Sequence, residues 1–356
     1  MTAFEELLTW QESSTSGEAI AAAVDAASRA SSGALELLAA PRIVVTGAGS
    51  SYYLALAVAA AARAALGRSA FATPLSELIL RPEGVLHGGN GARADSTPEP
   101  IVIISRSGAT SEAVDVAERM RAAGHPTIAV TCRAASPLAE LADVTLVSPA
   151  GDEAAIVMTR SFSSMLALLL GVVARAGRDE RLAADLAALP ARWPEAIAAA
   201  AVGRRLGQTE WSRIVILGGG PAFGIAAEWG LKLTETSQVP TSAYEPLEFR
   251  HGPISVCEPG MLVVGLVGGA GARDETAVVE ETARLGAATW LIASDETEAR
   301  GASGDVSLVG RDLHPTARLP LLLHPGHALA LQLALTRGRD PDAPRHLGQV
   351  VILGPA

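Results

Sequence analysis

Seven consecutive residues, Ser105-Arg-Ser-Gly-Ala-Thr-Ser111, carry four hydroxyls, one guanidinium and a glycine, directly after the apolar run 101–104. A turn of this kind between a strand and a helix presents backbone N–H groups that attract phosphate, and serine and threonine hydroxyls add further donors. Capping of a helix needs fewer hydroxyls, so phosphate binding is favoured over capping alone for Ser105, Ser107 and Thr110. No Walker lysine is present, so a nucleotide P-loop is not indicated.

A second glycine turn, Gly47-Ala-Gly-Ser-Ser-Tyr52, follows another short apolar run. Tyr52 stands where a dinucleotide fingerprint has its third glycine, and the next acidic residue is Glu77, too late to hold a ribose. An NAD site is therefore not expected. Ser50 and Ser51 at the start of the expected helix suit a small anionic or hydroxylated ligand.

Lys232 is the one lysine among 28 Lys and Arg side chains. Arginine stays protonated, whereas lysine can lose its proton and attack a carbonyl. In the segment 228–235, which is expected to be helical, Lys232 and Glu235 are three residues apart and share a face. A weak surface ion pair is the alternative interpretation. Because the segment follows a glycine turn directly, its face is expected to look into a cleft.

The segment 244–253 places two carboxylates, an arginine and a histidine beside a Gly-Pro turn. A lone histidine is more often structural, but His251 stands among Glu248 and Arg250 and titrates near neutrality, which favours function. Glu153 lies close to Thr159-Arg-Ser161 between two apolar segments. These residues either reach the same cleft or form a loop with a helix cap, and the residues alone favour the loop.

The elements that would position these side chains occur twice. The stretch 42–49, an apolar run that ends in a glycine turn, has a counterpart of the same pattern at 213–220. The apolar runs at 101–104 and 127–130 have counterparts at 262–265 and 289–292. Strands alternating with helices predict an α/β fold with two doubly wound, flavodoxin-like parallel sheets related by internal duplication. Ligands of such sheets bind at the carboxyl ends of the strands. The second copy has Leu266–Ala272 in place of the hydroxyl turn, so only the first copy is expected to bind an anion there.

This pattern divides the chain into a helical arm at 1–35, a first domain at 36–177, a helical linker at 178–208 and a second domain at 209–356. The second domain includes a C-terminal tail that is expected to end in a strand at 350–353.

Composition excludes several classes of protein. A net charge of −10 and a pI near 5.3 argue against a nucleic-acid binder. Hydrophobic residues at 49% and charged residues at 19% argue against disorder. No apolar run reaches the roughly 18 residues of a membrane span, and the acidic N-terminal segment does not resemble a secretory signal. Two unpaired cysteines and no ligand cluster predict neither disulfide nor metal site, and we expect no cofactor and a cytoplasmic location.

The four motifs in this order resemble the sugar isomerase (SIS) family of phosphosugar-binding proteins in its tandem form, over roughly residues 36–353. They are similar to the isomerase portion of glucosamine-6-phosphate synthase, to amino-sugar-phosphate deaminase/isomerases and to fructosamine-phosphate deglycases. The resemblance implies that the five hydroxyls named above hold a sugar phosphate. We also expect Glu153, Glu248 and Arg250 in the substrate site. The resemblance also implies that Glu235 transfers the proton, with Lys232 in the same active site. His251 would open the sugar ring, and in relatives that histidine comes from the neighbouring subunit, which implies a homodimer.

Two departures from the family narrow the expected function. Glutaminase domains carry a cysteine directly after the first methionine, whereas residue 2 here is threonine, so no glutaminase domain is expected. Gln349 stands where the synthases have an imine-forming lysine, and an amide cannot form that imine. We therefore expect a phosphosugar isomerase or an isomerising deaminase of a hexose or amino-hexose 6-phosphate. A non-catalytic sugar-phosphate sensor and a fructosamine-phosphate deglycase are the alternatives.

Overall fold

The computed structural model describes residues 3–86 and 98–352. The chain forms two compact units, each assembled from separate segments. The first-sheet unit consists of Glu18–Glu153, Arg160–Leu186 and Gly348–Ala356. The second-sheet unit consists of Met1–Gly17, Ala154–Thr159 and Ala187–Leu347.

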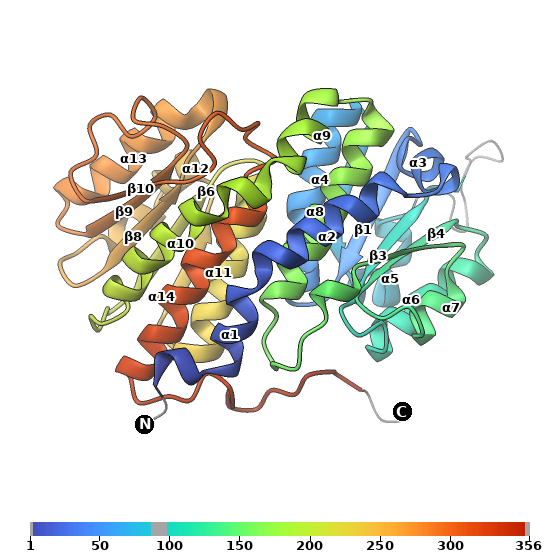
Figure 1. The fold of residues 1–356 in the computed structure, drawn as a ribbon, viewed down its shortest axis with the longest axis horizontal. Helices are drawn as coiled ribbons and strands as arrows, with labels where there is room; N and C mark the ends of the chain where they lie inside the picture. The colour runs from blue at the N-terminus through green and yellow to red at the C-terminus, as the bar shows by residue number, and fades with distance from the viewer. Residues whose placement is uncertain (1–2, 87–97, 353–356) are drawn as a thin grey trace. The chain divides into compact units, whose positions relative to one another are not determined.

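The first-sheet unit contains five parallel strands in the order β2-β1-β3-β4-β5 (Figure 1). The strands are β1 (Arg42–Gly47), β2 (Ser69–Pro74), β3 (Ile101–Ile104), β4 (Thr127–Thr131) and β5 (Val144–Val147). The helices around this sheet are α2 (Ser16–Ser28), α3 (Ser32–Leu38), α4 (Ser50–Leu66), α5 (Leu75–Leu80), α6 (Ser111–Ala122), α7 (Pro137–Leu141), α8 (Arg160–Gly177) and α9 (Glu180–Ala187), with 3-10 turns η2 (Pro82–Gly84) and η3 (Pro149–Gly151).

The second-sheet unit repeats this order as β7-β6-β8-β9-β10, again with all neighbours parallel (Figure 1). The strands are β6 (Ile214–Gly218), β7 (Thr241–Tyr244), β8 (Leu262–Leu266), β9 (Ala288–Ala293) and β10 (Asp305–Leu308). Its helices are α1 (Leu8–Ser14), α10 (Leu189–Leu206), α11 (Pro221–Ser237), α12 (Pro246–Phe249), α13 (Ala272–Arg284) and α14 (Leu323–Thr336), with 3-10 turns η1 (Phe4–Glu6), η4 (Pro253–Val256), η5 (Gly269–Gly271) and η6 (Leu319–Leu322).

Both sheets have the flavodoxin-like order, so the predicted fold class of two doubly wound parallel sheets is confirmed. The central strands β1, β3, β4, β6 and β8 are almost entirely buried, because helices cover both faces of a parallel sheet. The sequence pattern missed the edge strands β2 and β7. The strand expected at 350–353 is wrong for its described residues, 350–352, which form no regular structure.

The turns after β1 and β6 are conformational copies of each other. Gly49 has φ 55° and ψ −127°, and Gly220 has φ 55° and ψ −125°. Side chains disfavour this region, so each sheet needs a glycine to lead its first strand into its first long helix. The shared backbone geometry, 171 residues apart, agrees with duplication of one design.

One helical stretch within the described residues, Leu319–Thr336, is long and apolar enough to match a membrane span. However, 83% of it is buried inside the structure, and α14 packs against α10 and α11. Core helices of globular proteins show the same composition, so this stretch is weak evidence for a membrane.

Candidate functional site

The predicted phosphate-binding hydroxyls lie at one edge of the first sheet. β1 and β3 are neighbours in parallel register, so the turns that follow them start at the same edge. Ser50, Ser51, Ser105 and Ser107 are each 4–6% exposed, and Thr110 is partly buried. Ser105 Oγ lies 3.3 Å from Thr110 Oγ1, and Ser107 Oγ accepts the Ala109 N–H at 3.2 Å. The sheet register therefore brings these five predicted hydroxyl residues to one edge.

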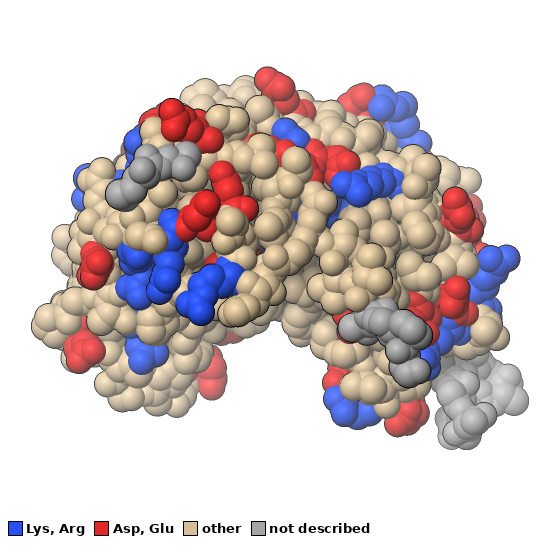
Figure 2. All heavy atoms as spheres, turned by 90° about the horizontal axis from the view of Figure 1, so that it is seen from below, with Lys and Arg blue, Asp and Glu red and all other residues tan. Residues whose placement is uncertain are grey.

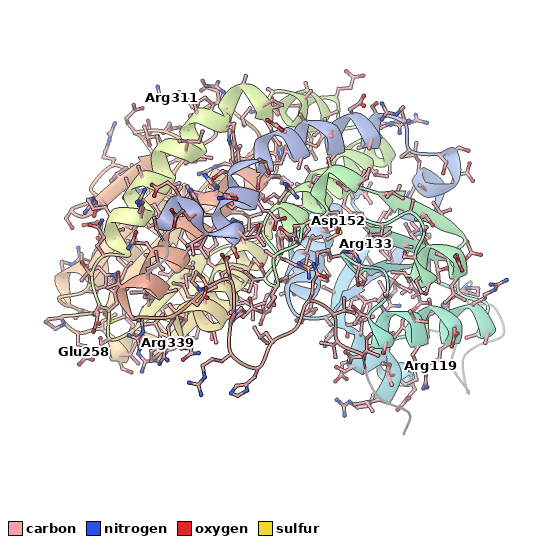
Figure 3. All side chains as sticks on the ribbon, turned by 60° about the horizontal axis from the view of Figure 1, so that its bottom comes forward. Arg119, Arg133, Asp152, Glu258, Arg311 and Arg339 are labelled. Carbon is pink, nitrogen blue, oxygen red and sulfur yellow. The ribbon has the colours of Figure 1, made fainter. Side chains whose placement is uncertain are left out.

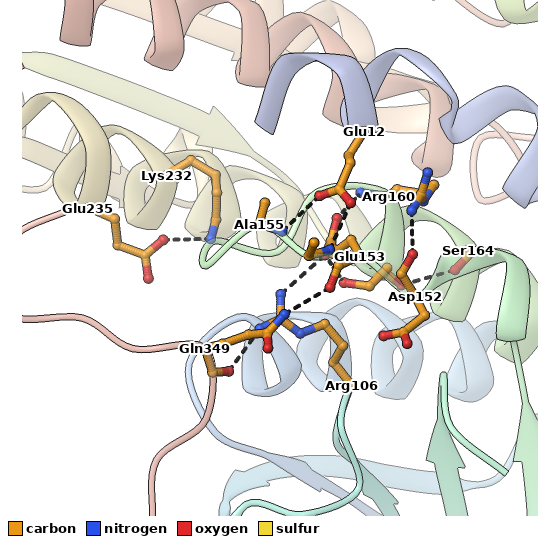
Figure 4. A network of polar contacts seen from close by, with 12 residues as sticks. Glu12, Arg106, Asp152, Glu153, Ala155, Arg160, Ser164, Lys232, Glu235 and Gln349 are labelled. Carbon is orange, nitrogen blue, oxygen red and sulfur yellow. Dashed lines mark hydrogen bonds and ion pairs between the residues drawn. The ribbon is translucent and has the colours of Figure 1, made fainter. Parts of the chain in front are cut away.

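Arg106, inside the hydroxyl turn, belongs to a network that the sequence did not reveal (Figure 4). Its guanidinium is 6% exposed, lies 3.5 Å from Glu153 Oε1 and donates to the Gln349 carbonyl at 2.8 Å. The Gln349 side chain in turn donates to the Glu153 carbonyl at 2.9 Å. Ser111, which begins α6, donates its N–H to the Val351 carbonyl at 3.3 Å. The C-terminal tail of the first-sheet unit is thus held against the hydroxyl turn.

Glu153 also caps a helix, as the residues alone suggested. Its Oε2 accepts the Arg160 N–H at 3.0 Å at the start of α8, and its Oε1 accepts the Ser161 hydroxyl. Asp152 beside it pairs with Arg133 at 3.0 Å, and both side chains are labelled in Figure 3. Both oxygens of the Glu153 carboxylate therefore accept hydrogen bonds from the chain. These bonds fix the carboxylate in position, so that it can hold Arg106 in place.

Lys232 sits between two carboxylates of its own helix, α11, in the second-sheet unit. Lys232 Nζ lies 2.6 Å from Glu235 Oε2 and 3.4 Å from Glu228 Oε1 (Figure 4). The side chains of Glu228 and Lys232 are 0% and 3% exposed, whereas that of Glu235 is 18% exposed. Glu235 is therefore the carboxylate of this group that a ligand can reach, and it is held by a neighbouring ammonium. The predicted pairing of Lys232 with Glu235 is present, and the pair is more buried than a surface ion pair.

The remaining predicted residues, Glu248, Arg250 and His251, lie after β7 on and just beyond α12. All three are exposed. Arg250 Nε donates to Glu281 of α13 at 2.7 Å. Among the described residues, no hydrogen bond or ion pair joins these three side chains to Glu235. The structure therefore shows direct contact between Lys232 and Glu235 and, among the described residues, no direct polar contact between either of them and this second group.

The second sheet carries carboxylates where the first sheet carries hydroxyls. Glu245, directly after β7, is one of them: burial raises its pKa, and the nearby Gly220 N–H in the turn after β6 opposes that shift. After β8, Glu275 accepts the Gly268 N–H at 3.3 Å and Glu298 accepts the Gly269 N–H at 3.0 Å. The backbone groups that would cradle a phosphate are thus bonded to side chains of the same chain.

Two charged groups at this second edge have displaced pKa values. Burial raises the pKa of Glu275 to about 7, with the nearby charges of Glu245 and Glu298 adding to the shift and the Gly268 N–H opposing it. Burial lowers the pKa of Arg318 to about 10. The acidic first turn of α13 was the sequence signal for Glu275, and nothing local in the sequence marked Arg318.

Neither charge sign dominates the face drawn in Figure 2, where basic and acidic side chains are interspersed. Within residues 3–86 and 98–352, no group of three or more His, Cys, Asp or Glu side chains could hold a metal ion.

Two doubly wound parallel sheets with polar turns at their carboxyl edges define the class of ligand-binding α/β proteins. The SIS domain model matches residues 93–175 and 209–308, about half of the chain, and the chain belongs to this family. The predicted family is therefore confirmed.

Several relatives share this architecture. The chain is 28% identical over 333 residues to glutamine–fructose-6-phosphate aminotransferase [isomerizing] of Gluconobacter oxydans, covering 87% of this chain and 52% of the relative. Glucosamine-6-phosphate deaminase of Thermotoga maritima is 26% identical with a TM-score of 0.78, covering 97% and 99% of the two chains. The C-terminal domain of glucosamine-fructose-6-phosphate aminotransferase of Francisella tularensis is 19% identical, with a TM-score of 0.83 over 96% and 100%. The chain thus spans about half the length of the curated relative.

Proposed function

We propose that this chain is an isomerising deaminase of an amino-hexose 6-phosphate. Its support is the similarity to a glucosamine-6-phosphate deaminase over nearly the full length of both chains, together with the polar groups that the fold positions. Aldose–ketose isomerisation of a hexose 6-phosphate is the second candidate, supported by the similarity to an isomerising aminotransferase. Both reactions begin with the same proton transfer.

The observation that carries the proposal is the Lys232–Glu235 pair. Glu235 Oε2 is held at 2.6 Å by the one amine side chain in the sequence, while the side chain keeps 18% exposure. A carboxylate removes a proton next to a carbonyl when it is positioned at hydrogen-bond distance, and a fixed cation stabilises the negative charge that develops on oxygen. We assign the base to Glu235 and the charge stabilisation to Lys232.

The reaction proceeds through the open-chain aldehyde. Glu235 takes the proton from C2, the C–H electron pair forms a C1–C2 double bond, and negative charge moves to the C1 oxygen near Lys232. The substrate's own C2 ammonium group gives a proton to that oxygen, and return of the proton from Glu235 to C1 then gives an alcohol at C1 and a protonated imine at C2. Water adds to the imine and ammonia leaves, which yields the ketose phosphate. No enzyme-bound imine is needed, consistent with Gln349 at the tail position.

Phosphate binding is assigned to Ser50, Ser51, Ser105, Ser107 and Thr110, with Arg106 adding positive charge to the turn. Glu153 and Gln349 position Arg106 through the contacts described above. His251 is assigned to ring opening, and Glu248 and Arg250 to the substrate site. Because no polar contact joins these three to Glu235 among the described residues, and because the resemblance implies a histidine from the neighbouring subunit, the proposal includes a homodimer in which a second copy supplies His251.

The test supplies glucosamine 6-phosphate and follows ammonia and ketose phosphate together. Release of both in equal amounts is the expected result for a deaminase, whereas ketose formation from a hexose phosphate without ammonia supports the isomerase. Glu235→Gln should lower turnover by about 10²- to 10⁴-fold while sugar-phosphate binding persists. Glu258→Gln, at an exposed carboxylate labelled in Figure 3, is the matched control and should keep full turnover.

Lys232→Arg separates two roles of the lysine, because it keeps the charge and removes the amine. Substantial remaining activity supports electrostatic stabilisation, whereas complete loss in a folded variant supports a covalent step at the amine. A sugar phosphate that raises the melting temperature but is never converted would replace the proposed enzyme by a non-catalytic binding protein. Full activity of Glu235→Gln would remove Glu235 as the base.

A further inference from the structure

A carboxylate on α1, outside the residues assigned above, binds the loop that follows Glu153. Glu12 and this loop, Ala154–Thr159, belong to the same compact unit. Glu12 Oε1 accepts the Ala154 N–H at 2.7 Å, and its Oε2 accepts the Ala155 N–H at 2.9 Å (Figure 4). The residue is 9% exposed. Hydrogen bonds to an ionised acceptor are stronger than those to a neutral one, so these two bonds hold the first peptide groups of the loop in fixed directions.

The first of these peptide groups also binds the C-terminal tail. The Ala154 N–H and the Glu153 carbonyl are the two ends of one planar amide. The Glu153 carbonyl accepts the Gln349 side chain at 2.9 Å, while the N–H at the other end donates to Glu12. Hydrogen bonds at the two ends of one amide polarise it in the same direction and strengthen each other. Glu12 therefore orients the carbonyl to which Gln349 is bound.

The same peptide group places two contacts of Arg106. Arg106 Nη2 donates to the backbone carbonyl of Gln349 at 2.8 Å. The Glu153 carboxylate lies 3.5 Å from Arg106 Nη1, and this side chain extends from a Cα that lies in the plane of the amide. A rotation of the amide moves both contacts at once. The orientation that Glu12 imposes is thus passed on to the guanidinium in the hydroxyl turn.

Glu12 can impose an orientation because α1 is itself fixed. At the start of α1, the Asp342 carboxylate accepts the Leu8 N–H at 2.8 Å and the Thr9 N–H at 2.9 Å. Leu7, directly before the helix, is 0% exposed. The first N–H groups of a helix have no partner within the helix, so the Asp342 carboxylate satisfies two of them and restrains this end of α1.

The other end of α1 is anchored by a buried serine. Ser13 Oγ lies 2.9 Å from His324 Nδ1 and 2.8 Å from His327 Nδ1, and Trp10 stacks on the His324 ring at 4.7 Å. A hydroxyl can donate one hydrogen bond and accept another, so it satisfies both Nδ1 atoms when both rings are neutral. Burial lowers the pKa of His324 to about 4 and holds the pKa of His327 well below its usual range, which keeps this anchor intact at neutral pH.

Apolar packing also holds this loop, and it leaves a separate task to Glu12. Ala155 and Val157 are 2% and 3% exposed, so van der Waals contacts keep the loop in place. Such contacts set no direction for an N–H or a carbonyl, whereas hydrogen bonds do. Loss of the Glu12 carboxylate should therefore turn peptide groups without displacing the loop.

We propose that Glu12 is a positioning residue of the sugar-phosphate site. It orients the peptide group between Glu153 and Ala154, and through that group it sets the place of Arg106 in the hydroxyl turn. The inference rests on the proposed phosphate site, and it adds to that site a carboxylate from α1 that acts through other residues.

Calorimetric titration of the full chain with glucosamine 6-phosphate and with inorganic phosphate tests this role. Glu12→Gln keeps the size of the side chain, but its amide has one acceptor oxygen, so one of the two N–H groups then faces an NH₂ group. The affinity for both probes should fall by the same factor, about three- to tenfold, because the change acts on the phosphate and not on the sugar. Glu6→Gln, at an exposed carboxylate of η1, is the matched control and should bind both probes normally.

Kinetics separates positioning from a loss of folded protein. A misplaced Arg106 weakens binding, so the KM for glucosamine 6-phosphate should rise by the same factor as the dissociation constant. Lys232 and Glu235 hold each other on α11, so kcat should stay unchanged. A variant that is merely less folded shows the opposite pattern, a lower kcat per chain at an unchanged KM, and that pattern would overturn the proposal.

A double variant tests the route through the shared peptide group. Gln349→Ala removes the donor to the Glu153 carbonyl and should weaken phosphate binding by a similar factor. Combined with Glu12→Gln it should cause little further loss, because both changes release the same amide, whereas the effects of independent changes multiply. Multiplied effects would show that Glu12 does not act through this amide and would overturn the proposal.

The outcomes keep this inference apart from the proposed function. Binding of both probes by the unsubstituted chain without any turnover would overturn the proposed reaction, and the titrations would still decide the role of Glu12. Equal affinities of Glu12→Gln and the unsubstituted chain would overturn the role of Glu12 alone. Failure of the unsubstituted chain to bind either probe would remove the phosphate site and both proposals with it.

If Glu12→Gln does not fold, Glu12→Asp takes its place. It keeps the charge and is one methylene shorter, so it cannot reach both N–H groups from the same position on α1. Weaker binding of both probes is again expected, and an unchanged affinity would overturn the proposal.

Discussion

The carboxyl edges of the two sheets share a backbone and differ in chemistry. Gly49 and Gly220 adopt the same unusual conformation, and the strand orders are identical. Yet the first edge carries serine and threonine hydroxyls with Arg106, while at the second edge Glu275 and Glu298 bind the turn N–H groups. The two edges thus share their backbone geometry and differ in the charge and hydrogen-bonding character of their side chains.

The difference shows that the position of a binding edge and its specificity come from different residues. Glycines and buried apolar strands place the edge, and changing them would alter the fold. The side chains after the strands are the part that differs: the hydroxyls and Arg106 of the first edge can donate hydrogen bonds, whereas the carboxylates of the second edge accept them. The following substitutions test whether the two edges differ as described.

The largest expected effect concerns the buried Arg106–Glu153 pair at the first edge. Arg106→Gln should lower the free energy of unfolding by about 3 kcal/mol or more, because the Glu153 carboxylate, whose side chain is 0% exposed, then loses its cation. The double variant Arg106→Gln with Glu153→Gln should recover much of this loss. Urea unfolding of the two single variants, Arg106→Gln and Glu153→Gln, and of the double variant measures the coupling, and additive effects would show that the two side chains act independently.

A smaller effect on the free energy of unfolding is expected at the second edge, where the raised pKa of Glu275 favours its protonated form in the folded state. Its folded pKa of about 7 lies above the ordinary value of 4.5, so the folded chain holds a proton that the unfolded chain has released. The stability contributed by this group is therefore lost as the pH rises from 4.5 towards 7, by about 2–3 kcal/mol. Glu275→Gln should gain stability relative to the unsubstituted chain between pH 5 and 8, measured by urea unfolding. A constant difference across this range would contradict the raised pKa.

The smallest expected effect is on the affinity for a sugar phosphate, which should depend on the first edge and not on the second. Ser107→Ala with Thr110→Ala should weaken sugar-phosphate binding roughly tenfold to a hundredfold, because two donors to a charged ligand are lost. Thr297→Ala removes an exposed hydroxyl that follows β9 of the second sheet and should leave the affinity unchanged. Titration of both variants with glucosamine 6-phosphate provides the comparison. An unchanged affinity of the double variant would move the phosphate away from the hydroxyl turn.

The sequence predicted the features that depend on local spacing. The repeated glycine turns and buried apolar runs predicted both sheets, and the three-residue spacing of Lys232 and Glu235 predicted their contact. The edge strands β2 and β7 were missed because they have few fully buried residues and lack the continuous apolar run of a central strand.

Contacts between distant residues left no local signal. Arg106 meets Glu153 across 47 residues and Gln349 across 243, and these contacts depend on how the loop after β5 and the tail return to the turn. Similarly, an acidic first turn is ordinary for any helix, so the sequence of α13 did not show that Glu275 would bind the glycine turn.

The interleaving of the two units constrains the order in which the chain can fold during synthesis. The second-sheet unit includes Met1–Gly17 but is completed only by Ala187–Leu347, and the first-sheet unit receives its segment Gly348–Ala356 after that. Domains usually fold as units, N-terminal first, as they leave the ribosome. Here the first-sheet unit lacks its last segment until the second-sheet unit has been synthesised, so the hydroxyl turn acquires its Gln349 contact only after that.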